Sequence, residues 1–375
     1  MGERVLAILR KEFRSVLRDP RMRFVILGLP VLQTLIFGYA VTLDVRHVRL
    51  AVVDRDGTPA SRELVARFTG SACFDAVAFP PNEAAARALI DAGEVAALLQ
   101  INAGFAEGLL AGRAMPVQLV VDGADSNTAR YVLNYATQIA AAANASLAAE
   151  TLRRRAGPAA APAGPELRPR VWFNPDLESR NYYVPGIIAM LVMLIGLMLT
   201  SMSIVREKET GTIEQIMVTP IRPVEFIVGK CAPFAVIGFL DTALVSAVGL
   251  FWFEIPFRGS FALLLLGTAL FLLSTLGIGL FISTVSRTQQ QAMMTTFFFF
   301  FPAMLFSGFI FPITSMPEAF QWLSLADPLR YFLVIIRGVF LKGVGADVLW
   351  PEMAALLAMG VAVMAFAVSR FRKTL

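Results

Sequence analysis

The chain has 375 residues, of which 57% are apolar and only 16% are charged, whereas about 25% of the residues of a typical soluble protein are charged. This composition and a mean hydropathy of +0.65 exclude an ordinary soluble protein and predict an integral membrane protein, since a helix needs roughly 20 apolar residues to cross the hydrocarbon core. The net charge of +5 does not indicate nucleic-acid binding, because Lys and Arg cluster beside the apolar runs.

Residues 1–20 predict an amphipathic helix that lies along the membrane surface. At about 100° per residue one face carries four apolar side chains, which are those of Val5, Leu9, Phe13 and Val16. The opposite face is basic. Residues 21–44 then predict the first membrane-spanning helix, for which a cleaved signal peptide is the alternative interpretation.

Residues 45–180 differ in composition and predict an α/β domain, because short strand-like runs alternate with helical ones. The expected strands are residues 49–54, 73–79, 95–101 and 117–121, and the expected helices are residues 59–69, 82–92, 104–111 and 124–155. Residues 157–169 are rich in Pro and Ala and predict a linker.

The rest of the chain predicts five more membrane spans, so the fold class is a membrane α-helical protein with six transmembrane helices and an extracytoplasmic α/β domain inserted between the first two. The further spans are residues 181–205, 225–254, 260–286, 292–312 and 350–369. Between the last two, residues 313–349 hold two apolar pieces too short to span, which must be buried in protein or return to the same side.

The distribution of basic residues orients these spans. Seven Lys or Arg precede Phe24, four lie between Val205 and Cys231, one is Arg287 and three follow Val368. With six spans all of these segments lie on one side, which the positive-inside rule makes the cytoplasm. The sequence therefore predicts cytoplasmic N- and C-termini, the latter in a tail at residues 370–375.

Known catalytic motifs are absent from the sequence. It contains no GxxxxGK[ST] phosphate-binding loop, HExxH or GxSxG motif, so an enzymatic activity in this chain is not expected. Cys73 and Cys231 fall in different kinds of segment, and neither a disulfide between them nor a metal site is expected.

The most informative segment is residues 205–230, which join two apolar runs yet carry eight ionised residues. Gly211 can end the preceding helix, and Thr212 can cap a new short helix with Glu214 in its first turn. Pro220 and Pro223 limit that helix. By itself this pattern fits either a surface that another protein binds or an ordinary interfacial helix.

This segment, REKETGTIEQ at residues 206–215, followed by Thr219-Pro220 and Gly229-Lys230, resembles the signature of ABC-2 type transporter permeases. A second stretch agrees, with SGFIFP at residues 307–312, DPLRY at residues 327–331 and then Arg337. The order of the segments also matches, so the resemblance covers the whole chain. The large inserted domain, including VDGADSN at residues 121–127, is most similar to the multidrug-export branch of the family.

The resemblance implies that residues 206–224 form a cytoplasmic coupling loop, which docks on a separate ABC ATP-binding subunit. ATP and Mg²⁺ would bind to that subunit, and no cofactor would bind directly to this chain. The residues expected to take part in coupling are Glu207, Glu209, Gly211, Thr212, Glu214 and Gln215. Lys230 is instead expected to reach the lipid headgroups.

The resemblance further implies a bacterial inner-membrane exporter of drugs or other lipophilic compounds, in which two identical or homologous permeases enclose the path. A periplasmic adaptor is a further candidate partner. Residues that could line the path are Asp241, Phe298, Phe301 and Ser307, although bundle packing alone also explains a buried acid or a Phe-rich helix. Two alternatives remain, namely a lipid or glycan exporter and an ATPase-driven mechanotransmitter or sensor without a substrate path.

Overall fold

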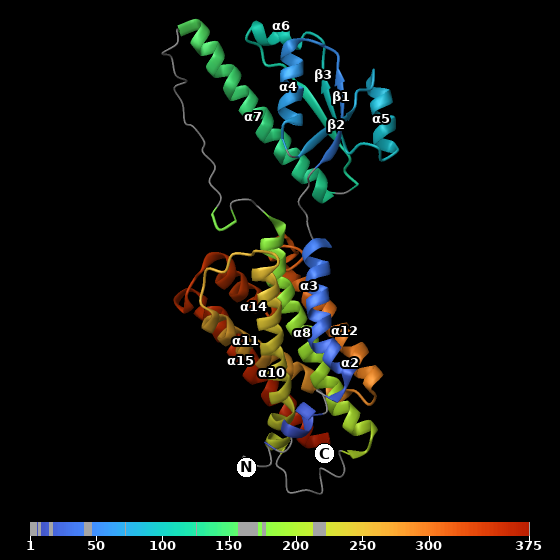
Figure 1. The fold of residues 1–375 in the computed structure, drawn as a ribbon, viewed down its shortest axis with the longest axis vertical. Helices are drawn as coiled ribbons and strands as arrows, with labels where there is room; N and C mark the ends of the chain where they lie inside the picture. The colour runs from blue at the N-terminus through green and yellow to red at the C-terminus, as the bar shows by residue number, and fades with distance from the viewer. Residues whose placement is uncertain are drawn as a thin grey trace. The chain divides into compact units, whose positions relative to one another are not determined.

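The computed structural model describes residues 6, 9–14, 18–40, 47–71, 73–124, 126–156, 172–174, 178–212 and 223–374. The chain forms two compact units, a helical unit of residues 1–42 and 170–375 and an α/β unit of residues 43–169. Each is described by itself (Figure 1). The predicted linker at residues 157–169 lies outside the described residues.

The α/β unit contains every strand and helix predicted for it within two residues at each end. Its elements are β1 (Val48–Asp54), α4 (Pro59–Thr69), β2 (Phe74–Ala78), α5 (Glu83–Asp91), β3 (Ala97–Ile101), α6 (Phe105–Leu110), β4 (Val117–Val121) and α7 (Ser126–Ala156). The helix starts follow local chemistry, since the Thr58 hydroxyl caps α4 and the Asn82 side chain caps α5.

The four strands form one sheet in the order β2-β1-β3-β4. β1 is parallel to β2 and β3, whereas β4 is antiparallel to β3. Helix α5 packs on one face of the sheet through Val53, Ala86 and Leu98. Helices α4 and α7 cover the other face, where Leu50, Phe68 and other apolar residues form the larger core.

The helical unit consists of long apolar helices and several short ones. They are α2 (Pro20–Arg23), the π-helical η1 (Phe24–Gly28), α3 (Leu29–Ala40), α8 (Ser179–Glu209), α10 (Pro223–Phe251), α11 (Phe261–Val285), α12 (Gln289–Phe306), the 3₁₀-helical η2 (Ile313–Ser315), α13 (Glu318–Ser324), α14 (Pro328–Arg337), the π-helical η3 (Gly338–Lys342) and α15 (Ala346–Thr374). In the described part of the chain, four helices are long and apolar enough to cross a membrane. These are α8, α10, α11 and α15, and a shorter apolar helix covers Phe24–Ala40.

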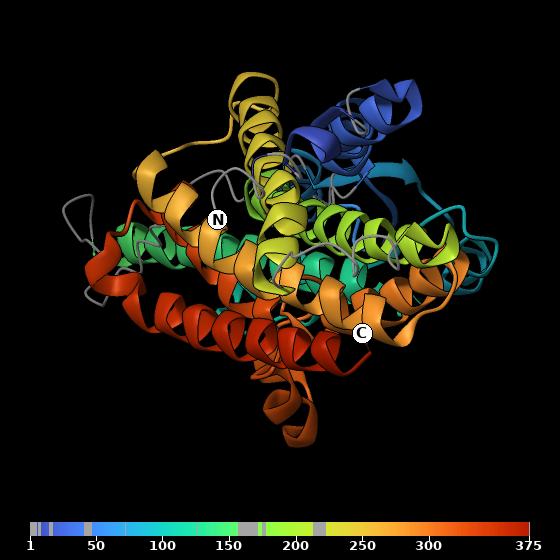
Figure 2. The ribbon, with the colours of Figure 1, turned by 90° about the horizontal axis from the view of Figure 1, so that it is seen from below.

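Helix α8 is the centre of this unit. Of its most apolar stretch 72% is buried, against 17% for α15, and α8 packs against α3, α10, α11, α12 and α14. Seen from below, α15 and α2–α3 lie on opposite sides of the bundle (Figure 2). Small residues allow close approach, as at Gly279, where an added Cβ would lie 3.2 Å from the Leu197 carbonyl oxygen.

Several observed helices differ at their ends from the predicted spans, most of all the last two. The helix expected over residues 292–312 ends at Phe306, because Gly308 turns the chain with a φ of +84°. The helix expected over residues 350–369 is longer and runs from Ala346 to Thr374. The two short apolar pieces form the short helices α13, with 7 residues, and α14, with 10.

A candidate coupling site at the ends of α8 and α10

A buried ion pair network joins α8, α10 and the N-terminal residues. The Lys230 side chain, near the start of α10, is only 3% exposed. Its Nζ lies 2.8 Å from Glu12 Oε1 and 2.8 Å from Glu207 Oε1, and it donates a hydrogen bond of 3.1 Å to Ser203 Oγ. We call Glu12, Ser203, Glu207 and Lys230 the Lys230 cluster.

A second lysine contacts the cluster from its rim. Lys11 Nζ lies 2.9 Å from Glu207 Oε1, but the Lys11 side chain is 61% exposed. Two cations therefore face two carboxylates, and the buried charges are balanced. This balance is required, because an unpaired charge inside a protein costs several kcal/mol.

The position of Lys230 corrects the sequence prediction. Lys230 was expected to reach the headgroups, but its amine instead contacts two carboxylates inside the protein. Sequence reasoning also missed Glu12, although a signal was present. Glu12 follows Leu9 by three residues and adjoins Phe13, so it interrupts the apolar face of the predicted helix.

Helix α8 ends where the sequence predicted. Glu209 is its last residue, and Gly211 has a left-handed φ of +69°, which glycine adopts without strain. The Thr212 hydroxyl donates to the Glu207 carbonyl oxygen at 3.3 Å. Thr212 therefore turns back on α8, whereas Glu214, Gln215 and the rest of residues 213–222 lie outside the described residues.

Two further contacts attach this end of α8 to its neighbours. The carboxylate of Glu209 accepts hydrogen bonds from the backbone amide and the side-chain amide of Gln289, the first residue of α12. Lys208 Nζ donates to the Ser283 carbonyl oxygen of α11 at 2.5 Å. The helix that leads into residues 213–222 is thus linked to α10, α11, α12 and the N-terminal residues.

The Lys230 cluster connects the two helices that flank residues 213–222. These helices are α8 and α10, whose adjacent ends the cluster holds together. Among the residues that the structure describes, no group of three His, Cys, Asp or Glu side chains could hold a metal ion.

The predicted path residues do not come together as one site. Asp241 is fully buried in α10, and neither of its carboxylate oxygens has a hydrogen-bond partner within the described structure. Ser307 is also buried and bonds locally at the end of α12. In contrast, Phe298 is 82% exposed and Phe301 52% exposed on the outer face of α12.

Comparison with known proteins identifies the chain. Residues 20–369 match the family described as ABC-2 family transporter protein, and this range includes every element of the helical unit from α2 to most of α15. The chain belongs to the ABC-2 family of transporter permeases. The motif at residues 206–215 and the order of the segments therefore indicated the family correctly.

Several relatives of this permease match along nearly their whole length. The probable multidrug ABC transporter permease YbhR of Escherichia coli is 33% identical over 100% of this chain and 99% of its own length. The probable multidrug ABC transporter permease YbhS of the same organism is 32% identical over 96% of this chain and 94% of its own length. The inner membrane transport permease YhhJ of Escherichia coli is 27% identical over 97% of this chain and 96% of its own length.

Proposed function

We propose that this permease is the membrane subunit of an ATP-driven exporter that moves drugs or other lipophilic compounds out of the cytoplasm or the inner leaflet. Two relatives that match all or nearly all of the chain are named as probable multidrug ABC transporter permeases. The observation that carries the proposal is the Lys230 cluster, which connects the flanks of residues 213–222 to the helical bundle.

The proposed topology has six spans in a bacterial inner membrane, with both termini in the cytoplasm. Two helices complete the four long ones. Residues 20–40 are helical throughout, which corresponds to about 31 Å at 1.5 Å per residue, and the 18 residues of α12 correspond to about 27 Å. The α/β unit would then be extracytoplasmic, and α13 and α14 would re-enter the bilayer from that side.

Energy would enter through a separate ATP-binding subunit that docks on residues 206–224. This assignment follows from the sequence, which contains no phosphate-binding loop. The Lys230 cluster supports it, because a groove that holds residues 213–222 would move α8 and α10 together. Glu207 is buried within the cluster, so its part in coupling would be to position these helices, and the exposed Glu209 is better placed for direct contact.

A second permease, identical or homologous, would enclose the substrate path. The outer face of α12 supports this arrangement, because its large exposed side chains recur at helical spacing. They are Met294, Phe298, Phe301 and Leu305. Phe298 and Phe301 would face the path. Asp241 is buried, so it would contribute to helix packing and would reach the path only if the bundle opens.

The docking proposal predicts that Glu214→Lys abolishes copurification of the permease with its ATP-binding subunit while the permease remains folded in the membrane. Glu94→Lys is a matched control, because Glu94 is an exposed acid of the α/β unit. Unchanged copurification and transport in the Glu214→Lys variant would refute the docking assignment.

The topology can be tested by labelling with a membrane-impermeant maleimide. A cysteine at position 130 should react from outside intact spheroplasts, and one at position 214 only after the membrane is opened. Both native cysteines, Cys73 and Cys231, are buried, so background labelling should be low. The reverse pattern would refute the six-span arrangement.

A further inference from the structure

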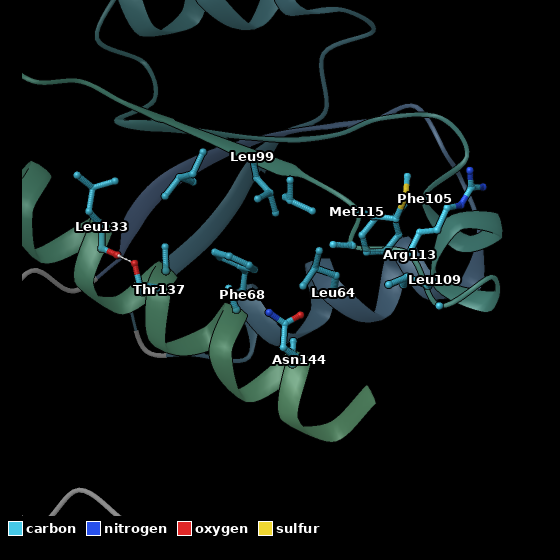
Figure 3. Close-up of a pocket in the computed structure, with 17 residues that line it drawn as sticks. Leu64, Phe68, Leu99, Phe105, Leu109, Arg113, Met115, Leu133, Thr137 and Asn144 are labelled. Carbon is cyan, nitrogen blue, oxygen red and sulfur yellow. Dashed lines mark hydrogen bonds between the residues drawn. The ribbon is translucent and has the colours of Figure 1, made fainter. Parts of the chain in front are cut away.

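The α/β unit contains a cavity of about 830 Å³ between its sheet and helices α4, α6 and α7. Leu64 and Phe68 of α4 lie across it from Leu99 of β3 (Figure 3). Leu119 of β4 and Phe105 of α6 extend this apolar lining. The volume is in the range of small-molecule sites, which is roughly 300–1,000 Å³.

The sequence of α7 explains why the cavity exists. A helix that covers a sheet normally fills the space with large aliphatic side chains. Apart from Leu133, the residues of α7 that line the cavity are small or polar, namely Ala136, Thr137, Ala140, Ala143 and Asn144. On the opposite face of the sheet, Val53 and Leu98 are buried beneath α5.

The walls of the cavity are held in place by specific contacts. The Asp56 carboxylate accepts hydrogen bonds from the amides of Phe105 and Ala106 at 2.9 and 3.2 Å, which fixes the start of α6. The Thr58 hydroxyl and these amides lower the pKa of Asp56, so it stays ionised. At Gly108 an added Cβ would overlap the Met115 side chain, so α6 and the loop after it pack closely.

The polar residues of the lining favour a particular charge. Among the described residues that line the cavity there is no carboxylate, and the charged one is Arg113, at the α6 end. Arg113 is exposed and forms no ion pair within the described chain. The Thr137 hydroxyl already donates to the Leu133 carbonyl oxygen, which leaves Arg113 as the charged group for a ligand.

We propose that the α/β unit binds a lipophilic anion in this cavity, with the apolar body of the ligand against Phe68 and Leu99 and its anionic group beside Arg113. This inference goes beyond the export function, because it assigns a ligand site to the inserted unit and needs neither ATP nor a partner subunit. Leu133 and other lining residues of α7 are exposed, so the cavity is open to water on that side, and an amphipathic ligand would remove its apolar lining from water.

The test measures how ligands protect a cysteine at the cavity from a water-soluble maleimide. The full chain carries Asn144→Cys in lipid nanodiscs, where both membrane faces are open to the reagent. The probes are 1-anilinonaphthalene-8-sulfonate, the uncharged N-phenyl-1-naphthylamine, which lacks only the sulfonate, and the cation tetraphenylphosphonium. Ala141→Cys is the matched control, because Ala141 is exposed on α7 but does not line the cavity.

At ten times its dissociation constant, the sulfonate should slow the labelling of Asn144→Cys about tenfold and leave that of Ala141→Cys unchanged. The uncharged probe should bind up to about fivefold more weakly, as expected for a partly exposed charge contact. Tetraphenylphosphonium should bind most weakly. Arg113→Ala should remove the difference between the first two probes.

Filling the cavity should abolish protection. Ala140→Trp is the first filling variant, and Thr137→Trp, on the same face of α7, is the second if the first alters labelling without ligand. The proposal is overturned if no probe protects Asn144→Cys, if protection survives both filling variants, if Ala141→Cys is protected equally, or if the cation protects best. None of these outcomes depends on docking of an ATP-binding subunit.

Discussion

Lys230 and Lys11 allow the contribution of a buried lysine to the free energy of unfolding to be compared with that of an exposed lysine. Both amines contact the same atom, Glu207 Oε1, at 2.8 and 2.9 Å, but their side chains are 3% and 61% exposed. Lys230→Met leaves Glu12 and Glu207 buried with the loss of their shared cation. Breaking a buried pair in this way costs about 3–5 kcal/mol, whereas an exposed pair contributes about 0.2–1 kcal/mol.

Lys230→Met should therefore lower the free energy of unfolding by at least about 3 kcal/mol, and Lys11→Met by less than about 1 kcal/mol. Unfolding in SDS, followed by far-ultraviolet circular dichroism, measures both. Combining Lys230→Met with Glu12→Gln and Glu207→Gln should recover most of the loss, because no buried charge is then left unpaired. Equal losses in the two single lysine variants would refute the reasoning.

Three further predictions use the same unfolding measurement. Gly211→Ala should cost about 1–2 kcal/mol through its left-handed backbone, since no atom crowds the new methyl group, and Gly211→Asn should cost less. Burial raises the pKa of Asp327 to about 7, so the folded protein keeps a proton that the unfolded chain loses near pH 4. Stability should fall as the pH rises from about 4 to about 7, and Asp327→Asn, which can still cap the Leu329 amide, should remove this dependence. Asp241→Leu should raise stability by about 1–3 kcal/mol, because both carboxylate oxygens lack partners in the described structure, and a loss of stability would show that Asp241 has a partner in the membrane.

The α/β unit was predictable because its elements are specified locally. Alternating apolar runs, the Thr58 and Asn82 caps and short turns all lie within a few residues of the element they define. The ends of the helices in the helical unit were less predictable, as α12 shows. Its Phe-rich run continues in composition to Phe311, but the backbone turns at Gly308, and apolar composition alone does not mark that point.

The Lys230 cluster was not predictable in detail, because its members are distant in sequence. Lys230 and Glu12 each look like ordinary charges beside an apolar run, and only the packing of the N-terminal residues against α10 brings them together. The same limit applies to the cavity of the α/β unit. The Ala-rich face of α7 is visible in the sequence, but only the fold shows that it faces a sheet.

The contact between Lys230 and Glu12 also has a consequence for how the protein is made. The two residues are separated by 218 positions, so at about 5–20 residues per second roughly ten to forty seconds of translation pass between their synthesis. During that interval Glu12 and, later, Glu207 have no Lys230 to pair with. The Lys230 cluster can therefore form only after α10 has been synthesised, so this end of the bundle is completed late.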